Sequence, residues 1–188
     1  MFKLAQGLGK SRFEADEAYL GALAAFRRKD LKTALAQIES AIARHPSHAE
    51  YHAALAWFQL EGEDRSRARA GFDRALTINP YEMLANYGLG MLAYKDKDWE
   101  AAAGYFLNAM AAQPDRPETM YYLSLVRHRQ GNNERALHWM SKAHEEFAEA
   151  DDKREKQCRA WMREFAKLAD EDAPRVRSQG RPIVPERG

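Results

Sequence analysis

A period of 34 residues runs through most of this 188-residue chain and limits the folds that it can adopt. Three prolines, two columns of alanines and one column of large apolar residues keep that spacing in a single register. These columns are Pro46, Pro80 and Pro114; Ala34, Ala68, Ala102 and Ala136; Ala41, Ala75, Ala109 and Ala143; and Ile38, Phe72, Phe106 and Met140. The period therefore predicts a repeated structural unit, each copy of which packs against the next.

Capping patterns predict that each unit holds two helices joined by a short turn. Near the start of each unit, a small polar residue stands three positions before a glutamate, which is typical of a capped helix N-terminus. These pairs are Ser11 and Glu14, Ser47 and Glu50, Asn79 and Glu82, and Asp115 and Glu118. Pro80 is expected at a first helical position. The second helices are expected to start at Asp30, Asp64, Asp98 and near Asn132. The resulting helices, of about 13 residues, are too short to be stable without their neighbours.

In period and residue types the chain resembles the tetratricopeptide repeat family, whose unit is a helix–turn–helix of about 34 residues. Repeats placed at 15–48, 49–82, 83–116 and 117–150 put the three prolines at the same position of successive repeats. The family's leucine position then holds Leu55, Leu89 and Leu123, and its tryptophan position holds Ala18, His52, Asn86 and Met120. The resemblance covers residues 11–150 and implies an all-α fold, a right-handed α-solenoid of four repeats.

A repeat stack needs a cover on its last apolar face. Residues 151–172 carry apolar side chains at three- and four-residue spacing, which predicts a capping helix. These side chains are Cys158, Trp161, Met162, Phe165 and Leu168. Cys158 is expected to pack there as a small apolar residue.

The two ends of the chain are less regular. Residues 173–188 hold three prolines and four arginines, so they are expected to be a flexible tail or, alternatively, a docking peptide. Residues 1–10 are expected to be flexible or to cover the first repeat, because Gly7 and Gly9 weaken a helix there.

Composition excludes several functional classes. Lysine and arginine total 29 against 28 aspartates and glutamates, so the clustered positive excess of a nucleic-acid binder is missing. The longest apolar stretch, Tyr87 to Tyr94, is far shorter than the roughly 20 residues of a membrane-spanning helix. No secretory signal is evident at the start, and contact with a membrane surface is not expected. One cysteine excludes an intramolecular disulfide. We therefore expect a cytoplasmic protein, and the frequent alanines and arginines are typical of a GC-rich bacterial genome.

No catalytic, cofactor or metal site is predicted. His48 and His52 stand one helical turn apart and could share a metal ion, but no further cluster of ligands accompanies them. Gly88 and Gly90 fall inside a predicted repeat helix, so they indicate close helix packing rather than a phosphate-binding loop. The chain is expected not to be an enzyme.

The family resemblance implies a groove lined by the first helix of each repeat, in which ligands lie. The groove positions hold Tyr19, Leu23, Phe26, Trp57, Leu60, Tyr87, Met91, Tyr94, Tyr121 and Leu125, with Asp16, Glu50, Glu118, Arg27, Lys95 and Arg129 at the rim. One column, Leu23, Trp57, Met91 and Leu125, is apolar where the family often keeps a polar residue. Four such side chains in water would be a liability, so a partner, the tail or a second copy is expected to cover them.

The same positions exclude one class of ligand. Some family members grip the acidic tails of chaperones with a clamp of lysine, asparagine and arginine residues. The corresponding positions here are Tyr19, Leu23, Ala54, Leu84 and Gly88. The clamp is therefore absent.

These observations predict a protein-interaction scaffold or chaperone-like adaptor. Its partner would be an apolar or amphipathic segment with some basic residues, because the rim carries Asp16, Glu50 and Glu118. The alternative is a self-assembling scaffold that forms a homo-oligomer through the groove or the termini. An RNA-associated repeat protein is a remote third hypothesis, since groove carboxylates would repel phosphates.

Overall fold

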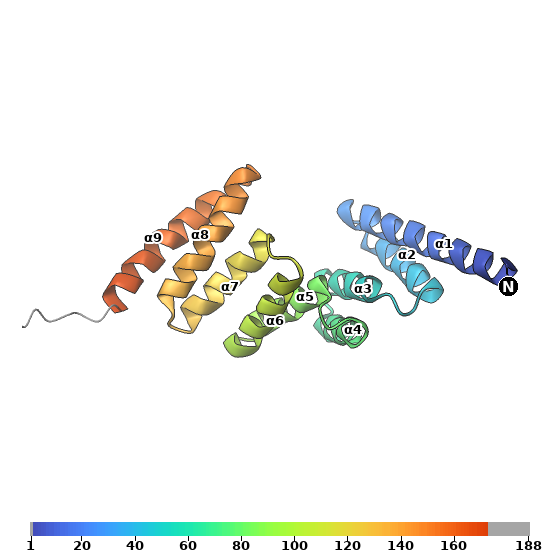
Figure 1. Ribbon diagram of the computed structural model, residues 1–188, viewed down its shortest axis with the longest axis horizontal. Helices are drawn as coiled ribbons and strands as arrows, with labels where there is room; N and C mark the ends of the chain where they lie inside the picture. The colour runs from blue at the N-terminus through green and yellow to red at the C-terminus, as the bar shows by residue number, and fades with distance from the viewer. Residues whose placement is uncertain (1, 173–188) are drawn as a thin grey trace, which may run out of the picture.

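The computed structural model describes residues 2–172, and nine α-helices without a strand make up this part of the chain. The helices are α1 (Phe2–Arg27), α2 (Leu31–Arg44), α3 (Ala49–Glu61), α4 (Arg65–Ile78), α5 (Met83–Lys95), α6 (Trp99–Ala112), α7 (Pro117–Arg129), α8 (Asn133–Glu149) and α9 (Glu155–Asp172). They follow one another in an elongated, bent row (Figure 1). Each helix packs against the next in the sequence, and α3 also contacts α5 directly. The chain is an all-α helical-repeat solenoid, as its period predicts.

The residue columns that define the period form the core. Every side chain of the two alanine columns and of the large apolar column has no exposed surface. The alanines let two helices approach closely, and the large residues fill the space between one helix pair and the next. In the same core, Cys158 and Phe165 of α9 are fully buried beside Met140 and Phe147 of α8, as expected of a capping helix.

The turn inside each repeat has one geometry, repeated four times. Its central residue adopts a left-handed backbone conformation, at Lys29, Glu63, Lys97 and Gly131. The next residue donates its backbone N–H to a carbonyl five positions earlier at 2.9–3.0 Å, the bond that closes a helix C-terminus. Its side chain then accepts an N–H from the first turn of the second helix. The predicted helix starts at Asp30, Asp64, Asp98 and Asn132 are thereby confirmed as N-caps.

The predicted starts of the first helices are wrong by one to three residues. The residue before Pro46, Pro80 or Pro114 is extended and ends the preceding helix, because a proline ring disfavours helical backbone before it. A further tight turn is needed before the next helix begins. The N-caps are therefore His48, Glu82 and Arg116, not Ser47, Asn79 and Asp115. Pro80 lies in the turn rather than at a first helical position.

The start of α1 also departs from the prediction. The helix begins at Phe2 and runs through Gly7, Gly9 and Ser11, so Ser11 is not an N-cap and residues 2–10 are helical. Adding a residue to an existing helix avoids the cost of nucleation, and the roughly 1 kcal/mol disadvantage of each glycine is small by comparison. The predicted tail, residues 173–188, lies outside the described residues.

Two glycines allow a direct test of this packing. A Cβ at Gly88 of α5 would overlap the Phe72 ring of α4, whereas a Cβ at Gly104 of α6 would meet nothing within 4 Å. Gly88→Ala should lower the free energy of unfolding by about 1–3 kcal/mol through overpacking. Gly104→Ala should raise it by about 0.5–1 kcal/mol, because alanine is the better helix former. Urea titrations followed by circular dichroism would measure both, and equal effects would contradict the packing.

Candidate protein-binding surface

Three hollows lie along the solenoid where first helices end and turn into second helices. The first hollow, of about 510 Å³, is lined by Phe26, Arg27, Lys29, Leu31 and Glu61. The second hollow, of about 250 Å³, is lined by Trp57, Leu60, Glu61, Glu63, Met91, Leu92 and Lys95. The third hollow, of about 420 Å³, is lined by Tyr94, Lys95, Lys97, Trp99 and Arg129. Successive hollows use equivalent positions of successive repeats, so together they form one repeating surface.

Much of the predicted groove lines these hollows. Phe26, Leu60, Met91 and Tyr94 are half-buried and leave part of each side chain at the surface. Phe26 is held in place by stacking on Phe58, with ring centroids 4.5 Å apart. Phe26 is therefore positioned by its contact with the buried Phe58.

The apolar column of the first helices is less open than expected. Leu23, Trp57 and Met91 are half-buried, and Leu125 is only 8% exposed, in the core cluster that α9 helps to form. Trp57 packs against three consecutive core clusters, so it also joins neighbouring repeats. Of this column, Trp57 and Met91 line a hollow, while Leu125 serves the core.

The tyrosines of the groove mainly stabilise packing. Tyr87 is 5% exposed and lies between Phe106, Tyr122 and the Arg116 guanidinium, whose carbon is 4.8 Å from its ring centre. Burial raises the pKa of Tyr87 well above its usual value. Tyr121 is half-buried against Tyr122, and its pKa is raised by burial too. Neither residue lines any of the three hollows.

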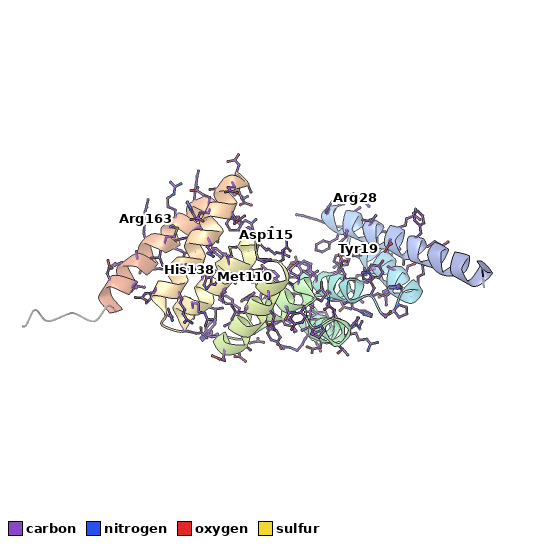
Figure 2. All side chains as sticks on the ribbon, viewed as in Figure 1. Tyr19, Arg28, Met110, Asp115, His138 and Arg163 are labelled. Atoms are coloured by element: carbon purple, nitrogen blue, oxygen red, sulfur yellow. The ribbon has the colours of Figure 1, made fainter. Side chains whose placement is uncertain are left out.

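The carboxylates predicted to face a basic partner are already engaged within the protein. Tyr19 of α1, labelled in Figure 2, donates its hydroxyl to Glu50 Oε1 at 2.7 Å, and Tyr51 of α3 donates its hydroxyl to Asp16. The two tyrosine rings lie 4.9 Å apart. Burial, followed by the bond to Glu50, raises the pKa of Tyr19 well above its usual value. These crossed bonds connect the first two repeats.

The third rim carboxylate is held by the start of α9. Glu118 lies 2.9 Å from Arg154 and 3.5 Å from Arg116. Arg154 also binds Asp152 at 2.7 Å, and its guanidinium lowers the pKa of Asp152 to about 2. Each of the three predicted rim carboxylates therefore has a partner within the protein, and Asp16 and Glu50 are also exposed to solvent.

The rim cations are differently placed. Arg27, Lys95 and Arg129 are exposed and line the hollows, as do the turn residues Lys29 and Lys97, which the sequence interpretation missed. Their signal was present in the 34-residue spacing of the turn residues Lys29, Glu63 and Lys97. That these turn residues line the hollows follows from the fold and is not visible in the spacing.

The candidate metal ligands have other roles. His52 Nε2 lies 2.8 Å from the Pro46 carbonyl, and His48 stacks on Tyr51 at 4.1 Å. Within the described part of the chain, no group of three or more metal-ligating side chains occurs. None of the helices described combines the length and apolar character that crossing a bilayer requires.

The fold and its surface define an all-α repeat solenoid with a partly apolar row of hollows, the general plan of a peptide- or protein-binding repeat protein. A family model for the tetratricopeptide repeat matches residues 19–83 and 87–151, more than half of the chain. The chain belongs to the tetratricopeptide repeat family. Comparison with curated protein sequences yields no match.

Solved structures share the fold at low sequence identity. PilF of Pseudomonas aeruginosa is 18% identical over 89% of this chain and 79% of its own, with a TM-score of 0.64. MamA of Desulfovibrio magneticus RS-1, from its residue 41 to its end, is 19% identical over 86% of this chain and 98% of its own, with a TM-score of 0.58. YrrB, described as a tetratricopeptide repeat protein with an unusual peptide-binding site, is 19% identical over 70% of this chain and 68% of its own, with a TM-score of 0.54.

The buried cysteine provides a test of how α9 packs. Cys158 has no exposed surface, and burial raises the pKa of its thiol to about 11. At pH 8 the folded protein should therefore react with iodoacetamide at least about ten-fold more slowly than an exposed cysteine, since the thiolate is the nucleophile. Mass spectrometry of alkylated protein, with and without urea, measures this. Equal rates in both conditions would mean that α9 does not cover the last repeat.

Proposed function

We propose that this protein is a non-enzymatic, cytoplasmic scaffold or adaptor that binds a segment of a partner protein along the three hollows. The observation that carries the proposal is the repetition of a partly apolar hollow at one position of successive repeats. A ligand that fits one hollow can continue into the next, so a chain with apolar side chains at intervals is the matching partner.

Similar structures support a peptide as the class of ligand. YrrB has a peptide-binding site, and the first repeat domain of Spaghetti (RPAP3) is bound to an HSP90 peptide. The latter is 12% identical to this chain, and the lysine and asparagine clamp for acidic chaperone tails is absent here. The ligand of this chain is therefore proposed from its own hollows.

A pair of substitutions in the second hollow tests the proposal. Leu60→Asn with Met91→Asn removes two half-buried apolar side chains from the hollow and spares Trp57, which packs against three core clusters. Affinity purification from the native host, followed by mass spectrometry, should lose the partner or reduce its recovery at least about ten-fold, because each apolar side chain contributes about 1–2 kcal/mol.

The matched control lies outside the three hollows. Leu107→Asn with Met110→Asn changes the same residue types on α6, where Met110 is labelled in Figure 2. Circular dichroism checks that both variants fold. A partner that is recovered equally with the Leu60 and Met91 variant, but lost with the control, would refute binding in the hollows.

Self-association is the second candidate function, and exposed apolar side chains on the first helix of the solenoid, α1, favour it. Phe13 and Leu20 of α1 are 69% and 64% exposed and lie seven residues apart, on one face of the helix. A hollow of about 620 Å³ lies between α1 and α2, and Gly21, which stands at the family's leucine position, is part of its lining. In later repeats that position is occupied by a leucine packed against the repeat before it.

Sedimentation equilibrium tests this second candidate. Wild-type protein should show a mass that rises with concentration, and Phe13→Ser with Leu20→Ser should keep the monomer mass. Tyr81→Ser with Leu107→Ser, two exposed apolar residues elsewhere, is the control and should behave as wild type. A wild type that is monomeric at every concentration would rule the candidate out.

A further inference from the structure

The third hollow differs from the other two in its charge. Its lining includes Lys95, Lys97 and Arg129 but no carboxylate. Glu61 lines both other hollows, and Glu63 lines the second as well. The third hollow is thus a local cluster of cations on a chain whose net charge is only +1.

The carboxylates nearest in sequence do not neutralise this cluster. Asp96 lies between the two lysines, but its side chain binds Arg65 at 2.6 Å and Arg69 at 3.3 Å. Asp98 accepts the Ala101 N–H at 3.1 Å and caps α6. In the described part of the chain, Lys95, Lys97 and Arg129 form no ion pair. Like charges gathered in this way repel one another and favour an anionic ligand.

Two aromatic rings give the hollow a rigid wall. Tyr94 and Trp99 lie with ring centres 5.4 Å apart and planes at 67°. The Trp99 backbone carbonyl accepts the Gln130 side-chain N–H at 3.3 Å, which joins α6 to the end of α7. The rings offer an apolar surface between the cations, suited to one apolar or aromatic side chain.

We propose that the third hollow binds an acidic segment of a partner protein. Carboxylates of the segment pair with Lys95, Lys97 and Arg129, and one apolar side chain lies against Tyr94 and Trp99. This inference rests on the proposed function and specifies the charge of the partner segment. The segment is acidic, whereas the rim residues Asp16, Glu50 and Glu118 predict a basic one. The reason is that Lys95, Lys97 and Arg129 gather in one hollow without a carboxylate, whereas none of the three rim carboxylates lines any of the three hollows.

Two other occupants fit less well. Residues 173–188 carry four arginines and one glutamate, so the tail has the same sign of charge as the hollow. A nucleic acid strand would continue from the third hollow toward Glu61 and Glu63, which repel its phosphates. A protein segment can place its acidic residues at one hollow only, and this favours a peptide.

Fluorescence anisotropy with synthetic peptides tests the inference. The probe is the fluorescein-labelled peptide SEEFEES, and its neutral counterpart is SQQFQQS. Wild-type protein should bind the acidic peptide at least about ten-fold more tightly, and added sodium chloride should weaken the binding. Equal affinities for the two peptides would overturn the inference.

Charge variants locate the binding site. Lys95→Glu, Lys97→Glu and Arg129→Glu together should abolish binding, and the three corresponding glutamine substitutions should weaken it at least about ten-fold. The matched control, Lys32→Glu with Lys156→Glu and Arg163→Glu, makes the same change in net charge at exposed positions of α2 and α9, of which Arg163 is labelled in Figure 2. It should stay within about two-fold of wild type. Binding that survives the first two variants would overturn the inference.

Two outcomes separate this inference from the function on which it rests. Tighter binding of labelled poly-uridine RNA than of SEEFEES, lost in the lysine and arginine variants, would overturn the acidic segment in favour of nucleic acid. If the charge variants still recover the native partner while Leu60→Asn with Met91→Asn loses it, the proposed function stands and the acidic segment is refuted.

Discussion

The structure depends on contact between short helices that cannot be stable alone. Each repeat places alanines where two helices cross and one large residue where adjacent repeats meet, and all of these side chains are fully buried. Because every helix relies on its neighbours, the unit of stability is the stack. The last repeat has α9 as its cover, whereas the face of α1 that carries Phe13 and Leu20 has none among the described residues. The two ends of the solenoid are therefore chemically different.

Charge distribution, more than apolar content, distinguishes the hollows from one another. Aspartates and glutamates of the groove connect elements of the protein itself: Asp16 and Glu50 join the first two repeats, and Glu118 holds the start of α9. Each of these contacts joins two elements of the fold, so the carboxylates contribute to its stability. Among the described residues, Lys95, Lys97 and Arg129 of the third hollow form no such ion pair.

Period and residue type were sufficient to predict the fold, because one register of alanines determines which helix faces meet. The caps of the second helices were predictable for the same reason, since an aspartate or asparagine at a helix start acts locally. The starts of the first helices of the repeats were not predictable in this way. Pro46, Pro80 and Pro114 disfavour helical backbone in the residue before them, and the extra turn that follows is not visible in the spacing of the sequence. Groove residues were identified by position, but their exposure depends on neighbours: Leu125 is buried by α9, and Tyr87 by Phe106 and Tyr122.

The left-handed turns show where backbone strain is tolerated. The fourth turn, which lines none of the three hollows, has a glycine at this position, Gly131, and glycine is the residue that a left-handed conformation favours. Lys29, Glu63 and Lys97 adopt the same conformation with full side chains, at a cost of about 1 kcal/mol each, and each lines one hollow. Glycine at these three turns would relieve the strain and stabilise the protein, but the hollows would lose the charged side chains of Lys29, Glu63 and Lys97. The retained strain gives each hollow its own charged group, so three repeats with the same backbone turn present three different chemical surfaces.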